Sequence, residues 1–205
     1  MAPRVVCFDL DGTLTRGITV SAHLAAWLGH DAELRELERR YAAGEISNRV
    51  VADVTARHYA GLELAAVRAQ LERLPLIGGI AETVGALRVA GAAVVLATVT
   101  WRFAAEALAE RFGFDAALGG TRIAAADGRV DRHCDEHDKS GAIAAWCAER
   151  DIPPAACAAV GDARSDLPLF AFAGRAIALN ATPAARAAAD ATVDAEDLAA
   201  VLPLL

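Results

Sequence analysis

The sequence is poor in cysteine, in aromatic residues and in lysine. Its four cysteines, Cys7, Cys134, Cys147 and Cys157, are too sparse for a disulfide scaffold and show no CxxC spacing, so we expect a reducing, cytoplasmic setting. Seven prolines and sixteen glycines among 205 residues, with 55% apolar residues, exclude a disordered chain. No apolar run approaches the roughly 20 residues of a membrane span, and none is typical of a targeting segment.

Basic charge is also limited. The chain has 20 Lys and Arg against 27 Asp and Glu, which gives a formal net charge of −7. A surface that binds nucleic acid needs clustered basic side chains to neutralise phosphates, so we expect neither a nucleic-acid nor a membrane partner. The length of 205 residues suits one globular unit, and the acidic balance suits a soluble enzyme that holds a cation, as a monomer or homodimer.

Short β-type runs alternate with helical patterns from Gly78 onward, which predicts an α/β fold with a parallel sheet. One of these runs, Ala156–Val160, is rich in alanine and could also be helical by propensity. Pro153-Pro154 and Gly161 bound it, which favours a short buried strand. Asp127-Gly128, between Ile123 and Val130, predicts a hairpin turn within Thr121–Asp131. The predicted strands are Arg4–Phe8, Ala92–Ala97, Ala156–Val160 and Arg175–Ala178.

The segment between Arg16 and Leu76 has helical periodicity throughout. It predicts about four short helices, inserted after the first strand and ending near Pro75. Ser21, Asp31 and Ser47 occupy the positions where N-caps are expected.

Two aspartates, Asp9 and Asp11, follow the first strand directly. The carboxyl end of a strand in an open α/β sheet borders the ligand crevice, and strand alternation would point both side chains to one side. Neighbouring carboxylates repel each other unless a cation or a shared proton intervenes. Gly12 permits a sharp turn close to a ligand. The pattern is typical of a site for a cation and a ligand, although an ordinary strand followed by a turn has the same residues.

The stretch Asp9-Leu10-Asp11-Gly12-Thr13 resembles the first motif of the haloacid dehalogenase superfamily of phosphatases. Stretches that resemble the other three motifs of this superfamily follow in the same order. Thr98, after the apolar run Val94–Ala97, resembles the second motif, with Thr100 as the competing candidate. Lys139 resembles the third: it is the single lysine among twenty basic residues, and it stands where this family places one. Gly161-Asp162, with Asp166 four residues later, resembles the fourth.

The resemblance implies a Rossmann-like core formed by residues 1–15 and 77–205, with a helical cap over residues 16–76 as in the phosphoserine-phosphatase-like branch. It implies hydrolysis of a phosphate monoester through an aspartyl-phosphate, with Asp9 as nucleophile and Asp11 as general acid and base. Mg²⁺ would be held by Asp9, the Asp11 carbonyl and Asp162, while Asp166 and Ser165 orient the site.

Phosphate contacts are implied for Gly12, Thr13, Thr98, Lys139 and the Val99 N–H. Around the leaving group, Arg16, Arg49, Trp101 and Arg102 are the candidates, and a small cap favours a small phosphorylated metabolite.

Phosphoserine itself is an open question. Ile18 and Asp53 stand where phosphoserine phosphatases of this family carry the glutamate and the arginine that bind the substrate's amino and carboxylate groups. A phosphotransferase or mutase on the same scaffold is an alternative, and a halide-releasing hydrolase is disfavoured because it needs neither Asp11 nor a metal. The segment His133–Asp138 carries metal-ligand residue types, but six adjacent residues cannot readily converge on one ion, so we interpret it as a solvated approach to the Lys139 helix.

Overall fold

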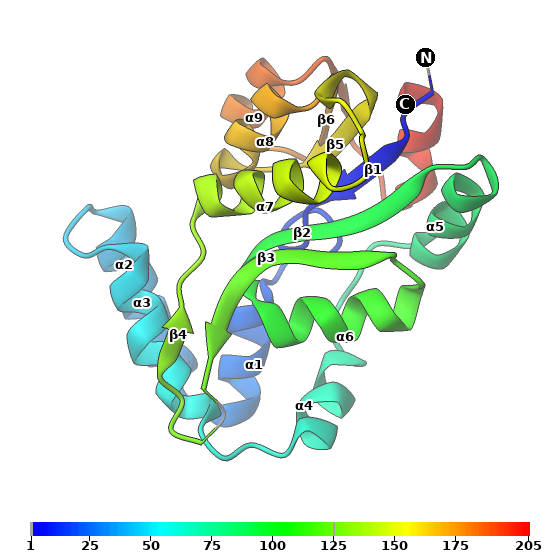
Figure 1. Cartoon of the computed structure of the whole chain (residues 1–205). Coiled ribbons are helices and arrows are strands. Elements are labelled where there is room, and N and C mark those ends of the chain that lie inside the picture. Colours follow the sequence, from blue (N-terminus) through cyan, green and yellow to red (C-terminus); the bar gives the residue numbers. More distant parts are fainter. Residues whose placement is uncertain (1, 125) are drawn as a thin grey trace.

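The computed structural model describes residues 2–124 and 126–205. Its centre is a seven-stranded sheet in the order β4-β3-β2-β1-β5-β6-β7, in which every neighbouring pair except β3–β4 is parallel (Figure 1). The α/β prediction is confirmed. The strands are β1 (Val5–Phe8), β2 (Ala93–Trp101), β3 (Ala116–Ile123), β4 (Val130–Arg132), β5 (Cys157–Gly161), β6 (Arg175–Leu179) and β7 (Ala191–Val193).

All four predicted strands are present, and the alanine-rich run is the buried strand β5, which lies between β1 and β6. The predicted hairpin is confirmed by the pairing of Ile123 with Val130. The prediction that the second strand ends before Thr98 is wrong, because the nine-residue β2 continues to Trp101 and pairs there with Thr121 of the eight-residue β3. Neither β3 nor β7 was predicted as a strand.

Helices cover both faces of the sheet. Successive side chains of a strand point to opposite faces, so Val6 and Phe8 of β1 pack on one side while Val5 and Cys7 pack on the other. All four β1 side chains are fully buried, as expected for a parallel sheet covered on both faces. The first face packs against α5 (Ile80–Val89), α6 (Arg102–Phe112) and the 3₁₀ turns of η4 (Leu198–Leu204); the second packs against α7 (Glu136–Ala148), α8 (Leu167–Phe172) and α9 (Pro183–Ala188).

Four α-helices lie between β1 and α5 in the chain, as the periodicity predicted: α1 (Val20–Leu28), α2 (Asp31–Ala42), α3 (Asn48–Thr55) and α4 (Leu64–Leu71), with the 3₁₀ turn η1 (Ala56–Tyr59) after α3. In Figure 1 they lie beyond the end of β2, on the side of the sheet opposite to the chain termini.

The N-caps of these helices were predicted only in part. Ser47 caps α3 by accepting a hydrogen bond from the Val50 N–H. Ser21 and Asp31 are not N-caps, because α1 starts earlier, at Val20 with Thr19 as its cap, and α2 has His30 at that position. Thr19 keeps an extended backbone and accepts from the Ala22 N–H, which fixes the start of α1 two residues earlier than predicted.

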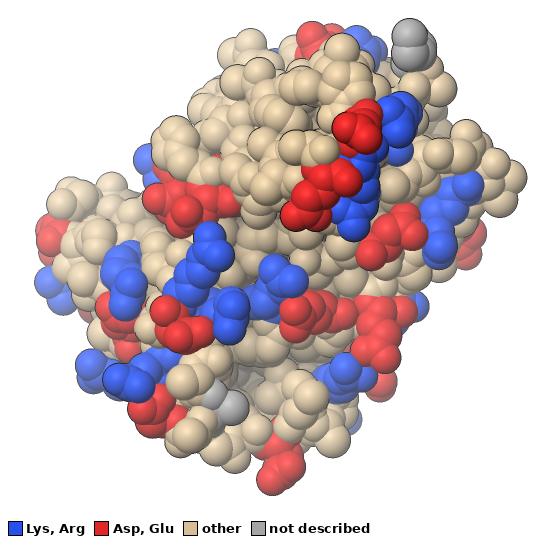
Figure 2. All heavy atoms as spheres, viewed as in Figure 1, with Lys and Arg blue, Asp and Glu red and all other residues tan. Residues whose placement is uncertain are grey.

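The surface carries both signs of charge. Figure 2 shows acidic and basic side chains next to one another over β3, β4 and α6, and pairs such as Arg122 with Asp131 and Arg102 with Glu106 account for this mixing. All four cysteines are buried and free. Within the described residues, the helices are too short or too polar to cross a lipid bilayer.

Candidate active site

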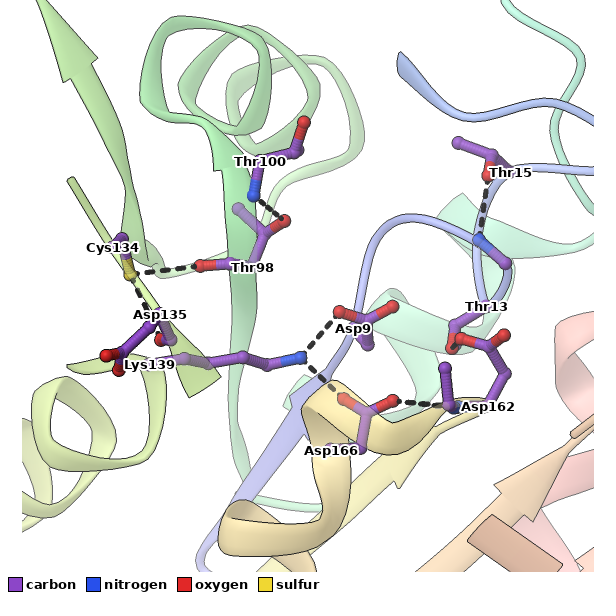
Figure 3. A network of polar contacts seen from close by, with 12 residues as sticks. Asp9, Thr13, Thr15, Thr98, Thr100, Cys134, Asp135, Lys139, Asp162 and Asp166 are labelled. Carbon is purple, nitrogen blue, oxygen red and sulfur yellow. Dashed lines mark hydrogen bonds and ion pairs between the residues drawn. The ribbon is translucent and has the colours of Figure 1, made fainter. Parts of the chain in front are cut away.

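The polar residues of the four motifs meet at the carboxyl ends of β1, β2 and β5. Lys139 comes from α7 on one side, and its Nζ lies 2.6 Å from Asp9 Oδ1 and 2.5 Å from Asp166 Oδ1 (Figure 3). Lys139 and Asp166 are fully buried and Asp9 is 3% exposed. Residues separated by as many as 130 positions therefore share one buried network of charges.

The start of α7 fixes the position of Lys139. Asp135 is the N-cap, its side chain accepts from the His137 and Asp138 N–H groups, and Asp138 closes a capping box by accepting from the Asp135 N–H. Lys139 follows at the first inward position of the helix. Asp135 and Asp138, two of the acidic residues of the segment His133–Asp138, thus cap this helix, while His133 bonds to Asn48.

Asp166 uses both of its carboxylate oxygens within the protein. Oδ1 accepts from Lys139, and Oδ2 accepts from the backbone N–H groups of Asp162 at 2.9 Å and Ala163 at 3.1 Å. It stands at the end of the 3₁₀ turn η3 (Arg164–Asp166), directly after β5. The geometry makes Asp166 the residue that orients both Lys139 and the Asp162 loop.

Asp9 has an oxygen without a protein partner. Its Oδ1 is bonded to Lys139, whereas Oδ2 is buried and accepts no hydrogen bond from the described residues. Carboxylate oxygens of Asp9, Asp162 and Asp166 all lie within 4.8 Å of one another. A buried acceptor without a donor is costly, and oxygen donors are what a hard divalent cation prefers. The residues of this cluster therefore fit such an ion.

Burial and repulsion by neighbouring carboxylates raise the pKa values of Asp9 and Asp162. The pKa of Asp162 rises to about 7, first because of burial and then because of the charge on Asp166. Burial and Asp166 also raise the pKa of Asp9, against the opposing effect of Lys139. Burial alone would lower the pKa of Lys139, but Asp9 and Asp166 hold it above its usual value, so the amine stays charged.

Asp11 is linked to the inserted helices. Its Oδ1 accepts from the Val20 N–H at 2.7 Å, the first residue of α1. Burial raises the pKa of Asp11 to about 6, while hydrogen bonds from Val20 and from the Thr100 side chain act in the opposite direction. A carboxyl group with this pKa can hold a proton close to neutral pH.

The turn that leads from Asp9 and Asp11 to the first helix depends on Gly12. Its φ is +90°, and a Cβ there would lie 2.6 Å from Asp162 Cγ, so both conformation and space require glycine. Its N–H donates to Thr15 Oγ1, and the neighbouring Thr13 hydroxyl donates to Asp162 Oδ1 at 3.4 Å. This turn places the first and fourth motifs side by side.

Thr98 and Thr100 have different surroundings. Thr98 is 1% exposed, and its hydroxyl oxygen accepts from the Thr100 N–H at 3.1 Å. The pairing of β2 with β3 becomes irregular between Thr98 and Trp101, and this end of β2 lines a cavity together with Asp11. Thr100 and Val99 line a cavity there.

This cavity, of about 200 Å³, lies between the end of β2 and the inward faces of α2 and α3. We name it the leaving-group cavity. It is lined by Asp11, Thr19, Ser21, Leu34, Glu38, Tyr41, Asn48, Val51, Ala52, Thr55, Val99, Thr100, Trp101 and Thr121.

Among the four residues predicted nearest the leaving group, only Trp101 lines this cavity. The side chain of Arg16 pairs with Glu196, and that of Arg49 pairs with Asp53 at 2.9 Å on the surface of α3. Arg102 pairs with Glu106 and lines a separate cavity of about 600 Å³ beside β3. Arg16, Arg49 and Arg102 thus pair with carboxylates outside this cavity, and the sequence did not predict these pairs.

Sequence reasoning missed the residues that α2 and α3 contribute to the cavity. Leu34, Glu38 and Tyr41 follow the spacing i, i+4, i+7 and so lie on one face of α2. Glu38 is exposed, and no local pattern distinguishes it from the other charged residues of α2. Ile18, at the predicted glutamate position, packs against the hydrophobic core instead.

Comparison with known proteins agrees with this architecture. The haloacid dehalogenase-like hydrolase family matches residues 6–171. The phosphoserine phosphatase of Halobacterium salinarum is 32% identical over 94% of this chain and 93% of its own length, whereas the chain spans only 60% of the Archaeoglobus fulgidus phosphoserine phosphatase, at 27% identity. The chain therefore belongs to the haloacid dehalogenase-like hydrolase family, which confirms the resemblance seen in its motifs.

Similarity of fold extends over the whole chain. A solved phospho-aspartyl intermediate analogue of phosphoserine phosphatase aligns with a TM-score of 0.81 at 22% identity, covering 99% of both chains. The sheet with its inserted helices is thus the architecture of that enzyme.

Proposed function

We propose that this protein is a Mg²⁺-dependent phosphatase that hydrolyses a small phosphate monoester through an aspartyl-phosphate on Asp9. The observation that carries the proposal is the position of Asp9: one oxygen is fixed by buried Lys139, and the other is buried without a partner beside Asp162. The named phosphoserine phosphatases among its relatives support the same reaction class.

In the first step, an Asp9 oxygen attacks phosphorus and the ester bond to the leaving group breaks. Asp11 gives its proton to the departing alkoxide, which leaves as an alcohol. The raised pKa of Asp11, about 6, supports this role because part of the population keeps its proton near neutral pH. In the second step, Asp11 takes a proton from water as the water oxygen attacks phosphorus, which releases phosphate and regenerates Asp9.

The other motif residues position and neutralise the reacting groups. Lys139 holds Asp9 and places a positive charge where phosphoryl oxygens gather negative charge. Thr98, the Val99 N–H, Gly12 and Thr13 are proposed to contact the remaining phosphoryl oxygens. Asp9, the Asp11 carbonyl and Asp162 would hold Mg²⁺, which when bound offsets repulsion between the anionic nucleophile and the anionic ester. Asp166, with both oxygens bonded, orients this set.

The residues 1–15 and 77–205 are proposed as the catalytic core and residues 16–76 as its cap. The leaving-group cavity supports this division, because Asp11 and Thr100 come from one part and Glu38 and Asn48 from the other. A cavity of about 200 Å³ suits a small metabolite rather than a protein substrate.

The test combines turnover with trapping of the intermediate. Release of phosphate from p-nitrophenyl phosphate and from small alkyl phosphates is expected with Mg²⁺ and is lost with EDTA. Asp9→Asn abolishes turnover and covalent labelling by radioactive phosphate, whereas Asp11→Asn accumulates label because breakdown of the phospho-enzyme is slow. Full activity of the Asp9→Asn protein would show that the nucleophile is assigned wrongly. An added alcohol that captures the phosphate better than water would favour a phosphotransferase.

A further inference from the structure

The wall of the leaving-group cavity is unusual in its charges. Of its described lining residues, two carry acidic side chains, Asp11 and Glu38, and no lysine, arginine or histidine is among them. The remaining polar residues offer hydroxyl and amide groups. A ligand that fills this cavity beyond the phosphate therefore meets a negative potential.

Glu38 owes its place to the helix face on which it lies. Leu34 and Tyr41, one turn to either side of it, line the same cavity, so the exposed Glu38 lies on the face of α2 that borders the cavity, beside the buried apolar residues Leu34 and Leu37. The three arginines of α2 are paired with other carboxylates: Arg35 with Asp31, Arg39 with Glu36, and Arg40 with Glu45. Among the described residues, Glu38 takes part in no ion pair.

The two cavity carboxylates carry charge of the same sign and line one cavity. A cationic group placed there would offset this charge, because an opposite charge attracts an ionised carboxylate. Trp101 lines the same cavity and is 4% exposed, with its ring packed against Tyr59 and Phe103.

From this arrangement we infer that the leaving group of the substrate carries an ammonium group and no carboxylate, with Glu38 as the residue that binds the ammonium. The inference rests on the proposed phosphatase function and narrows its substrate class to the phosphate esters of small amino alcohols. A carboxylate on the leaving group would face two like charges without a basic partner.

Four esters separate the two charges of the leaving group: phosphoethanolamine carries only the ammonium, phosphoserine carries both, phosphoglycolate carries only the carboxylate, and propyl phosphate carries neither. We expect kcat/KM to be highest for phosphoethanolamine and about tenfold lower for phosphoserine and phosphoglycolate, because the ammonium gains a contact with Glu38 while a carboxylate is repelled by Glu38 and Asp11. The kcat/KM for propyl phosphate should lie between the value for phosphoethanolamine and the values for the two carboxylate-bearing esters.

Three variants assign the selectivity to Glu38. Glu38→Gln should lower the ratio of kcat/KM for phosphoethanolamine over propyl phosphate by about tenfold, mainly through KM. Glu38→Arg should raise the ratio for phosphoglycolate over propyl phosphate. The matched control is Glu36→Gln on the same helix, which removes a surface pair with Arg39 and should leave all four values as in the natural protein.

The outcomes distinguish the two proposals. Hydrolysis of propyl phosphate or p-nitrophenyl phosphate with phosphoserine preferred over phosphoethanolamine, or with selectivity unmoved by Glu38→Gln, overturns the ammonium assignment and leaves the phosphatase intact. Failure to hydrolyse any ester with Mg²⁺ present overturns the phosphatase proposal and the inference that rests on it.

Discussion

Lys139 neutralises two buried carboxylates, and its removal should be costly. Lys139→Met leaves Asp9 and Asp166 facing each other without a cation, so we expect a loss of about 3–5 kcal/mol in the free energy of unfolding. Urea unfolding at pH 7.5 with EDTA measures it. The control Arg150→Met removes an exposed cation near the end of the same helix and should cost less than about 1 kcal/mol. Equal losses in the two variants would contradict the role assigned to the buried network.

Gly12 offers a sharp test of the turn between the first and fourth motifs. Gly12→Ala forces a Cβ into the Asp162 carboxylate at a φ of +90°, so Asp162 must move and Mg²⁺ affinity should fall at least about tenfold. Gly17→Ala is the matched control, because its φ is +68° but no atom lies within 4 Å of the added Cβ. Calorimetric titration with Mg²⁺ compares them. A similar affinity in both variants would mean that backbone strain, rather than the Asp162 contact, matters.

At the residue scale, the motif residues were predictable because each lies in a short local pattern at a strand end or a helix start. The residues that line the leaving-group cavity were not predictable in this way. Arg16 was expected there, but its partner Glu196 is 180 positions away, and no local pattern announces such a pair. Glu38 was one of many charged residues in α2, and its importance appears only when Trp101 and Thr100 lie opposite it.

Helix α7 positions Lys139, the buried cation that contacts Asp9 and Asp166. Asp135→Ala removes the side chain that accepts two N–H groups of its first turn, which should lower stability by about 1 kcal/mol. Because Lys139 lies just after this turn, Mg²⁺ affinity or turnover should also decline, which a purely thermodynamic loss would not cause at temperatures well below unfolding. Glu149→Ala, at the exposed end of α7, is the control. The measurements are thermal unfolding and turnover of p-nitrophenyl phosphate.

At the element scale, the buried strands with uninterrupted apolar residues were predicted and those with glycines were not. β3 contains Gly119 and Gly120, both at positive φ, so its sequence has the composition of a turn. The structure gives the reason: a Cβ on Gly120 would crowd the backbone of Arg102, and one on Gly119 would crowd the Thr98 carbonyl. β7 is a three-residue edge strand, too short for a periodic signal. Close packing around β2, not strand propensity, determines β3.

For the whole molecule, the carboxyl cluster links stability to pH and to the metal. The folded, metal-free protein binds protons more tightly than the unfolded chain at Asp162, whose pKa rises from 3.8 to about 7, and at Asp11, whose pKa rises to about 6. With respect to these groups, the free energy of unfolding should therefore be highest below about pH 4 and should fall as the pH rises from about 4 to 7, by about 1.4 kcal/mol per pH unit for each proton difference.

Thermal or urea unfolding in EDTA between pH 4.5 and 7.5 measures this slope. Asp162→Asn removes one titrating group, so its slope should be shallower by up to one proton. Saturating Mg²⁺ should stabilise the natural protein most at high pH, by about 2.7 kcal/mol at a hundredfold excess over Kd, because the cation replaces the protons. An identical slope in Asp162→Asn, or a Mg²⁺ effect that is greatest at pH 4.5, would contradict the assignment of the cluster.

The burial of the only lysine in the sequence has a practical consequence for chemical labelling. Because Lys139 Nζ is enclosed and engaged by two carboxylates, amine-reactive esters cannot reach it while the sheet and α7 remain packed. Acylation at this position would thus report opening of the catalytic pocket. A mass-spectrometric time course of labelling, with and without Mg²⁺, would follow the breathing of that region without an introduced probe.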